Sequence, residues 1–315
     1  MKGLQVNDTA QFEHSIKLSG KQARYYDFAQ LHTASNSTVL EIESSNDQPQ
    51  PKPMAHFYGG NGFTVGVYQP LLSALSDQFH VTSLAMRGYW HDLPQDKVMT
   101  REQDADMLIE FLEQTQSGPV IGIGHSQGAT ATALAAAKRP DLFCAIYLID
   151  PVTFTKAQSL LYSRIPRRVL LTRQPFKSTK VKQADWESVE AYYQHLRAQS
   201  PFRRISDENL RLFAANSLIE KPEGGFTLLF GPQYELASYF GTPYITPALK
   251  KLNQLNLTYH LILAKPTMFV SDDVRKSWQG IVPRDRITTL ADYGHLVPME
   301  APEQCAKLIF KLQSR

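Results

Sequence analysis

The chain has 315 residues, of which 43% are hydrophobic and 20% are charged. This length holds one large or two small domains, and the hydrophobic content is sufficient for a sizeable core. The net charge of +3 argues against nucleic-acid binding as the main role, and no stretch approaches the roughly 20 apolar residues of a membrane span.

Several further features predict a cytoplasmic protein. The N-terminal residues Met1–Ala10 contain one lysine and no apolar stretch of the kind found in secretory signals. Cys144 and Cys305 each lie among apolar residues, which predicts buried side chains instead of a disulfide or a metal pair. The sequence has no metal-ligand spacing, no phosphate-binding glycine loop and no internal repeat, so we expect neither a metal nor a cofactor.

Strand-like and helical stretches alternate along the chain, which predicts an α/β fold with a mostly parallel central sheet and helices on both faces. Phe12–Leu18 and Ala23–Leu31 are strand-like, and Ser44–Lys52 is a polar, proline-containing linker before the next strand. Continuous apolar runs such as Ile146–Ile149 and Leu261–Leu263 are typical of strands that are covered on both faces.

The most informative stretch is Val120–Thr130, V-I-G-I-G-H-S-Q-G-A-T. An apolar strand enters the pattern G-x-S-x-G at Gly124–Gly128, and Ala129–Lys138 is a strong helix former. Such a turn holds its serine in strained backbone geometry, and the free N–H groups of the helix that follows stabilise negative charge there. We therefore expect Ser126 to be a nucleophile. The alternative is a tight turn whose serine only caps the helix.

The segment 152–244 separates two apolar strands. Its part Arg164–Lys182 contains seven Lys or Arg residues and no acidic residue. This basic run is either a solvated face or a surface that attracts anionic substrates or an anionic membrane. Asp185–Gln199 and Asp207–Leu218 are predicted helices that begin with an aspartate near the N-cap.

The expected base lies near the C-terminus. A neutral serine hydroxyl is a poor nucleophile and needs a histidine to take its proton. His295 follows the strand-like run Ile287–Leu290 on a glycine-containing loop, and a helix is predicted from Pro302. His125, beside the serine, is expected to pack in the core or to line the pocket.

Taken together, these stretches resemble the α/β-hydrolase family over most of the chain. The matching stretches follow the family's order: Pro53–Gly62, Val81–Trp90, Val120–Gly128, Cys144–Pro151, Thr258–Ala264 and Asp292–Glu300. The resemblance implies a core made of residues 1–151 and 245–315, with residues 152–244 as a helical lid inserted after the sixth strand. It also implies a catalytic triad in the order Ser…Asp…His.

The resemblance places the acid of the triad after the seventh strand or at the end of the sixth. The stretch Ala264–Phe269, after the seventh strand, has no carboxylate. Asp150, at the end of the sixth strand, is therefore the expected acid, although it would otherwise cap a turn. Asp272 and Asp273 remain alternatives and would otherwise form a helix N-cap.

The resemblance further implies an oxyanion hole made of main-chain N–H groups. One donor is Gln127, which follows the nucleophile. If Asn61–Phe63 corresponds to the family's oxyanion loop, the second donor is Phe63. A competing alignment uses His56 and the pair Gly59–Gly60.

These expectations predict a serine hydrolase that cleaves a small carboxylic ester with an apolar part through an acyl-enzyme. Other reactions on the same triad remain open, namely amide, thioester or carbon–carbon bond hydrolysis, acyl transfer to an alcohol, or perhydrolysis. A non-catalytic protein that binds a small molecule under the lid is the alternative from another class. The sequence does not indicate an oligomeric state.

Overall fold

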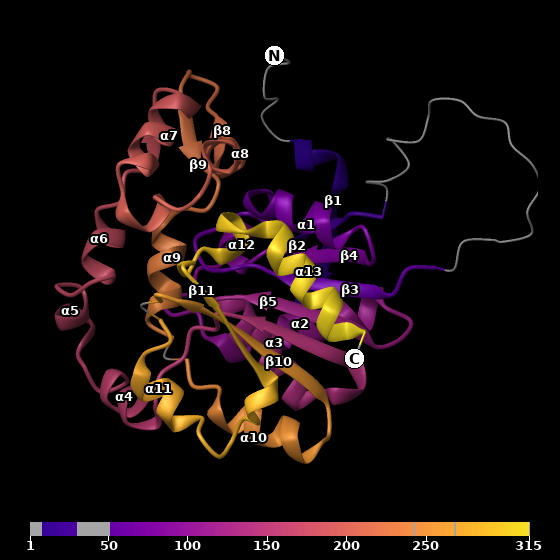
Figure 1. Cartoon of the computed structure of the whole chain (residues 1–315). Helices are drawn as coiled ribbons and strands as arrows, with labels where there is room; N and C mark the ends of the chain where they lie inside the picture. Colours follow the sequence, from indigo (N-terminus) through magenta and orange to yellow (C-terminus); the bar gives the residue numbers. More distant parts are fainter. Residues whose placement is uncertain (1–7, 30–50, 242, 268, 315) are drawn as a thin grey trace, which may run out of the picture.

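A computed structural model describes residues 8–29, 51–241, 243–267 and 269–314 (Figure 1). Its central sheet has eight strands in the order β1-β2-β4-β3-β5-β6-β10-β11. The strands are β1 (Glu13–Leu18), β2 (Lys21–Asp27), β3 (Met54–Tyr58), β4 (His80–Leu84), β5 (Val120–His125), β6 (Phe143–Ile149), β10 (Thr258–Lys265) and β11 (Ile287–Ala291). Only the pairings of β2 with β1 and with β4 are antiparallel, so the predicted, mostly parallel sheet is confirmed.

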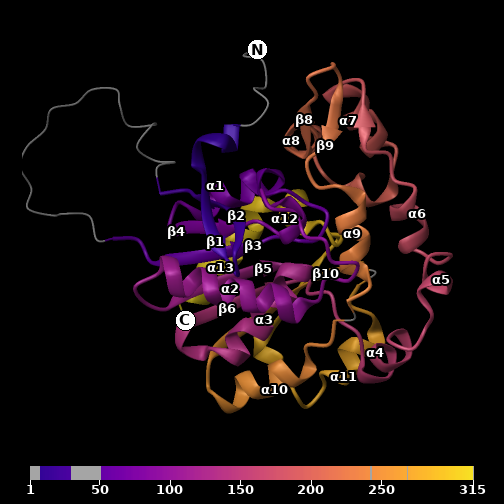
Figure 2. The same ribbon diagram turned by 180° about the vertical axis from the view of Figure 1, so that it is seen from behind.

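Helices cover both faces of this sheet, as the alternating pattern predicts (Figures 1 and 2). On one face, α1 (Gln69–Leu75) packs against α13 (Pro302–Gln313). On the other face, α3 (Gln127–Lys138) packs against α2 (Arg101–Thr115) and α10 (Thr246–Gln254). Shorter elements are α11 (Asp272–Ser277), α12 (Val297–Glu300) and the 3-10 helices η1 (Asp8–Phe12), η2 (Val65–Tyr68), η3 (Arg87–Tyr89), η4 (Pro140–Leu142) and η6 (Arg284–Arg286).

The core lies between the middle of the sheet and these helices. Every residue of β5 is buried, and so are the six middle residues of β10, which agrees with the apolar runs Val120–Ile123 and Leu261–Ala264 in these strands. Cys305 is buried in α13, as predicted. The prediction for Cys144 was wrong, because the second residue of β6 turns away from the core and is exposed while its neighbours are buried.

The two predicted opening strands correspond to β1 and β2, which form an antiparallel hairpin. The second strand is shorter than expected and ends at Asp27. The last two residues of the predicted strand Ala23–Leu31 and most of the predicted linker Ser44–Lys52 lie outside the described residues.

Residues 152–244, called the inserted segment below, form a unit between β6 and β10. It contains α4 (Lys156–Tyr162), α5 (Arg167–Leu170), α6 (Phe176–Lys180), α7 (Val189–Arg197), η5 (Ser200–Phe202), α8 (Asp207–Ser217) and α9 (Pro232–Tyr239). It also contains a three-stranded antiparallel sheet in the order β7-β9-β8, made of β7 (Asp185–Trp186), β8 (Leu218–Glu220) and β9 (Phe226–Leu228).

The expectation of an entirely helical segment was therefore incomplete. The predicted helix at Asp185 begins later, because Asp185 and Trp186 pair with β9 and Ser188 caps α7 by accepting a hydrogen bond from Ala191 N–H. The second predicted helix is confirmed as α8.

The two ends of the inserted segment meet. The Phe154 N–H donates to the Pro243 carbonyl over 2.9 Å, and the Ile245 N–H donates to Thr153 Oγ1 over 3.2 Å. The segment thus leaves and re-enters the core at one point. Among the described helices, none is long and apolar enough to cross a membrane.

Candidate active site

Ser126 stands on a sharp turn between β5 and α3. Its backbone has φ 56° and ψ −121°, a conformation that costs energy for a residue with a side chain. Gly128 is required here, because a Cβ atom at this position would lie 2.1 Å from the Tyr58 carbonyl oxygen. The turn leaves Ser126 only 6% exposed at the end of the sheet where the parallel strands finish.

Three candidate residues from distant parts of the chain meet at this turn. His295 Nε2 lies 3.0 Å from Ser126 Oγ, and His295 Nδ1 lies 2.7 Å from Asp150 Oδ2. His295 comes from the loop after β11, and Asp150 follows β6 directly. The serine, the imidazole and the carboxylate are therefore joined by two hydrogen bonds in series.

The Asp150 carboxylate is completely buried and accepts further hydrogen bonds. Ala264 N–H donates to Oδ1 over 3.1 Å, and the Thr267 hydroxyl donates to Oδ2 over 2.6 Å. Thr267 follows β10, where the family resemblance led us to expect a carboxylate. Sequence reasoning missed it, although its place in the stretch without a carboxylate was a usable signal.

The alternative acids lie elsewhere. Asp272 and Asp273 are exposed in the first turn of α11, and within the described ranges neither is hydrogen-bonded to His295. The N-cap role considered for them belongs to Ser271 instead, whose hydroxyl accepts a hydrogen bond from Val274 N–H over 3.3 Å.

A second chain of hydrogen bonds runs behind the site. Gly60 N–H can only donate, so Tyr68 Oη accepts it over 2.7 Å and directs its own proton to His125 Nδ1 at 2.8 Å. His125 Nε2 must then carry a proton, which it donates to the His295 carbonyl oxygen over 2.9 Å. This chain joins the loop after β3 to the loop that holds His295.

Burial determines the protonation of the two central members of this chain. Burial lowers the pKa of the completely buried His125 well below its ordinary value, and the neighbouring His295 lowers it further. Burial also raises the pKa of Tyr68. His125 is therefore neutral and Tyr68 keeps its proton, as the directions of the hydrogen bonds require.

The loop that carries His295 is also held by Glu300. Gly294 N–H donates to Glu300 Oε2 over 2.6 Å. Burial raises the pKa of the Glu300 carboxyl group. The ring of Phe269 packs against the imidazole of His295, with 4.2 Å between the ring centroids.

Two main-chain regions contain possible oxyanion donors. The Gln127 N–H is the first of α3, and it has no acceptor among the described residues, as expected at a helix N-terminus. On the other side, a Cβ atom at Gly60 would lie 3.2 Å from Ser126 Cβ, so the loop after β3 passes directly beside the nucleophile. The Gly60 N–H donates a hydrogen bond to Tyr68 Oη, whereas the main-chain N–H groups of Asn61 and Phe63 have no acceptor in the described part of the chain.

The inserted segment contacts this loop. Asn61 Nδ2 donates to the Glu235 carbonyl over 2.9 Å, and the Glu235 carboxylate, which pairs with Lys182 Nζ at 2.8 Å, lies against Gly62. The rings of Phe63 and Phe213 pack edge to face with centroids 5.6 Å apart. Apolar and polar groups of the segment therefore lie close to the residues beside Ser126.

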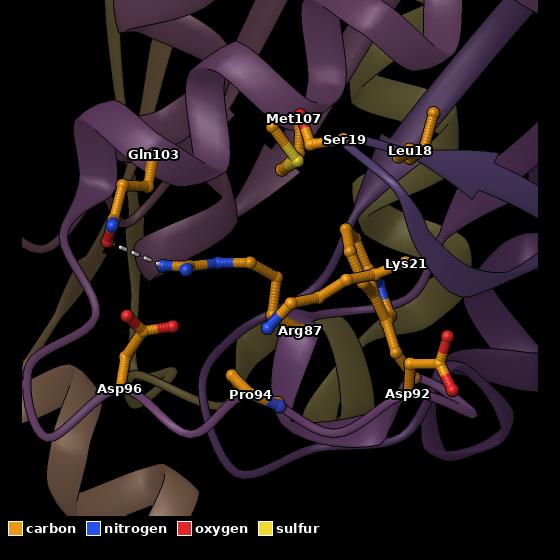
Figure 3. Close-up of a pocket in the computed structure, with 10 residues that line it drawn as sticks. Leu18, Ser19, Lys21, Arg87, Asp92, Pro94, Asp96, Gln103 and Met107 are labelled. Atoms are coloured by element: carbon orange, nitrogen blue, oxygen red, sulfur yellow. Dashed lines mark hydrogen bonds between the residues drawn. The ribbon is translucent and has the colours of Figure 1, made fainter.

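A separate cavity of about 170 Å³ lies between the β1–β2 hairpin, the loop around η3 and α2 (Figure 3). Arg87 extends into it, and its Nη2 donates a hydrogen bond to Gln103 Oε1 over 3.2 Å. Its Nε donates to the buried Asp104 carboxylate over 2.7 Å. The residues that line this cavity include none of Ser126, Asp150 and His295. The candidate site is therefore defined by its hydrogen bonds and not by this cavity. Within the described residues, no group of three or more His, Cys, Asp or Glu side chains is arranged to hold a metal ion.

Comparison with known proteins gives matches over most of the chain. The sequence model of the alpha/beta hydrolase family matches residues 54–308. The chain is 27% identical over 187 residues to 2-(acetamidomethylene)succinate hydrolase of Mesorhizobium japonicum, and 24% identical over 188 residues to (E)-2-((N-methylformamido)methylene)succinate hydrolase of Acinetobacter baylyi. These alignments cover 58% and 59% of this chain, and they span 66% and 64% of the relatives, just under two thirds of their lengths.

Solved structures agree on the fold. The crystal structure of E-2-(acetamidomethylene)succinate hydrolase has a TM-score of 0.72 and 18% identity, and covers 96% of this chain and 99% of that one. The structure of an esterase from Mycobacterium tuberculosis has a TM-score of 0.65 and 14% identity, with 96% and 91% covered. At these identities the likeness concerns the fold alone.

Proposed function

Because this chain belongs to the alpha/beta hydrolase family, we propose that it is a serine hydrolase that cleaves a carboxylic ester through an acyl-enzyme. Its relatives named above are hydrolases, which supports hydrolysis as the type of reaction. The observation that carries the finer proposal is the series of hydrogen bonds from Ser126 through His295 to Asp150, at 3.0 and 2.7 Å. A hydroxyl, an imidazole and a carboxylate joined in this order perform nucleophilic acyl transfer in unrelated proteins.

The proposed mechanism has two steps. His295 Nε2 takes the proton of Ser126 as Oγ attacks the substrate carbonyl, and it returns the proton to the leaving alcohol. Asp150 accepts the hydrogen bond from His295 Nδ1–H, fixes that tautomer and stabilises the imidazolium ion. Water, activated by the same imidazole, then releases the acid and frees Ser126.

The oxyanion of each step is proposed to bind main-chain N–H groups. Gln127 supplies one, and its place at the start of α3 adds the positive end of the helix dipole. The second comes from the loop after β3. Phe63 is the donor if Asn61–Phe63 is the oxyanion loop. The passage of Gly60 directly beside Ser126 supports the competing alignment at Gly59–Gly60. For that alignment we propose the adjacent Asn61 N–H as the donor, because it has no acceptor among the described residues. One such donor is worth roughly 3 kcal/mol in the transition state.

We propose the inserted segment as a lid, with residues 1–151 and 245–315 as the core. The contacts of Glu235 and Phe213 with the loop after β3 support this arrangement. Phe63, Phe213 and Phe269 bring apolar surface close to the site, which favours a small substrate with an apolar part.

Amide hydrolysis is the second candidate reaction. The two relatives named above are named for hydrolysing substrates whose names contain an amido group. The same triad performs ester and amide cleavage, so the two reactions differ in the leaving group that His295 must protonate.

Labelling with a fluorophosphonate probe tests the nucleophile. We expect one adduct, located on Ser126 by mass spectrometry, and none in Ser126→Ala. Ser73→Ala, which changes an exposed serine on α1, should label like the wild type. An adduct that persists in Ser126→Ala, or folded protein that takes no adduct, would count against a serine hydrolase.

Paired substrates then decide between the two reactions. We expect p-nitrophenyl esters of short and medium acyl chains to be hydrolysed faster than the matching p-nitroanilides. Faster turnover of the anilides would replace the ester proposal by the amide proposal while leaving the triad in place.

A further inference from the structure

The outermost part of the inserted segment carries unbalanced positive charge. Residues 160–181, called the outer strip below, contain no acidic residue. All six Lys and Arg side chains of the strip are exposed, namely Arg164, Arg167, Arg168, Arg173, Lys177 and Lys180. Within the part of the chain that the structure describes, none of the six forms an ion pair, whereas four other basic side chains of the inserted segment do, namely Lys182, Arg197, Arg211 and Lys221.

The same strip exposes large apolar side chains. Leu160, Leu161, Val169 and Val181 are 50%, 60%, 37% and 77% exposed. Single exposed apolar residues are normal on protein surfaces, but here four lie in the same strip as the six exposed cations. A basic face that contacts only water gains nothing from exposing large apolar side chains.

The inward side of the outer strip is already occupied. Leu170, Phe176 and Thr179 are buried, and the ring of Phe176 packs on Phe240 with 5.0 Å between centroids. Both views show α4, α5 and α6 following one another along the outer edge of the molecule (Figures 1 and 2). Apart from Arg167, which donates to the Lys97 carbonyl and stacks on Phe240, the cations and the four large apolar side chains of the strip are open to solvent.

We propose that the outer strip binds the surface of an anionic lipid bilayer. Such a surface offers negatively charged headgroups to the cations and, a few ångströms deeper, an apolar phase to leucine and valine. This is a docking surface separate from Ser126, and it does not depend on the proposed reaction.

Two other occupants fit the strip less well. Nucleic acid would pair with the cations but leaves the exposed leucines in water, and none of the strip's exposed residues is an aromatic side chain on which bases could stack. A second copy of this chain would bring six cations against six cations, which opposes association.

Vesicle co-sedimentation tests the proposal. We expect the wild-type protein to sediment with phosphatidylcholine vesicles that contain phosphatidylglycerol and to stay in solution with pure phosphatidylcholine vesicles. Raising the ionic strength to about 1 M shortens the Debye length to about 3 Å and should release most of the protein. Equal binding to both kinds of vesicle, or to neither, would overturn the proposal.

Charge variants identify the surface. The triple variant Arg164→Gln, Arg168→Gln and Arg173→Gln should lower the partition onto anionic vesicles roughly 100-fold, as expected for three lost headgroup interactions. Arg167 is left in place because it stacks on Phe240 and holds the Lys97 carbonyl.

A matched control removes three exposed lysines elsewhere, with Lys250→Gln, Lys251→Gln and Lys276→Gln. It should bind at least tenfold more tightly than the strip variant. Equal losses in both variants would show that only net charge matters and would contradict a specific surface.

A further pair of changes tests the apolar contribution. Leu160→Ser with Leu161→Ser should lower the partition about tenfold at unchanged charge, while circular dichroism and fluorophosphonate labelling stay as in the wild type. Unchanged partition, tighter binding to duplex DNA than to anionic vesicles, or self-association that these changes abolish would overturn the proposal in favour of another occupant.

Discussion

At the scale of single residues, the candidate site depends on the carboxylate of Asp150, which no water reaches. Its two oxygens accept from the His295 imidazole, the Ala264 N–H and the Thr267 hydroxyl. A residue that serves three donors in a buried position has no close substitute, because an amide in its place turns one acceptor into a donor.

Replacing Asp150 by Asn tests this dependence. We expect kcat/KM for an ester to fall by about 10⁴-fold, because the amide favours the wrong tautomer of His295. Asp272→Asn is the matched control and should retain wild-type activity. Near-normal activity in Asp150→Asn with loss in Asp272→Asn would assign the acid to α11.

The chain from Tyr68 through His125 gives a second prediction at this scale. In long-range ¹H–¹⁵N spectra, His125 should be neutral, protonated at Nε2 and unchanged between about pH 5 and 8, because burial lowers its pKa. Tyr68→Phe leaves Gly60 N–H and His125 Nδ1 without partners. We expect it to lower the free energy of unfolding by about 1–3 kcal/mol for each group. A titrating His125, or a Tyr68→Phe variant as stable as the wild type, would contradict the assigned directions of these hydrogen bonds.

Sequence reasoning brought out Ser126, Asp150 and His295 because each stands at a local signal, a turn or the end of an apolar strand. Tyr68 has no such signal, and the only signal for Thr267 is its place in the stretch after β10 that lacks a carboxylate. Their importance arises from contacts between positions 117 and 57 residues apart in the chain, respectively. The folded arrangement is what shows these contacts.

At the scale of elements, Gly124 and Gly128 allow β5 and α3 to pack closely at the turn that carries Ser126, since a Cβ atom at Gly124 would lie 2.5 Å from Ala129 Cα. Gly128 also approaches the Tyr58 carbonyl closely, so the start of α3 packs directly against the end of β3. We expect Gly128→Ala to lower the free energy of unfolding by at least about 3 kcal/mol.

Gly118→Ala is the control for that change. A Cβ atom at Gly118 meets nothing within 4 Å, so this variant should stay within about 0.5 kcal/mol of the wild type. Urea unfolding of both variants measures the difference. Equal stabilities would mean that the β3 loop moves aside easily.

Elements of the core were predictable because their apolar runs and glycine turns are local. The elements of the inserted segment were harder to predict from the sequence. In the sequence, Asp185 resembles the N-cap of a helix. In the structure, Asp185 and Trp186 form β7 and pair with residues of β9 that lie about forty positions later in the chain. Similarly, Cys144 has apolar neighbours on both sides, and only the pleat of β6 decides that its side chain faces solvent.

At the scale of the whole molecule, buried histidines make stability depend on pH. Burial lowers the pKa of His56 to about 3, and that of His125 also lies well below its ordinary value. Below about pH 6.5 the unfolded chain binds protons at these positions that the folded protein does not. The free energy of unfolding should therefore fall with falling pH, by about 1.4 kcal/mol per pH unit for each site.

The variant His56→Gln isolates one of these protons. Between about pH 4 and 6, the slope of stability against pH should be smaller by about 1.4 kcal/mol per pH unit than in the wild type. His14→Gln, at an exposed position, is the control for the loss of one histidine. Identical slopes in all three proteins would show that His56 is protonated in the folded state.

The meeting of the two ends of the inserted segment has an evolutionary consequence. Because Phe154 and Pro243 are hydrogen-bonded neighbours, about ninety residues behave toward the core as a single surface loop. Lineages can lengthen, shorten or replace such a loop without altering the strands on either side of it. We expect a chimaera that carries another family member's segment between Thr153 and Ile245 to keep Ser126 of this chain as its nucleophile. Its substrate preference should become that of the protein that donated the segment.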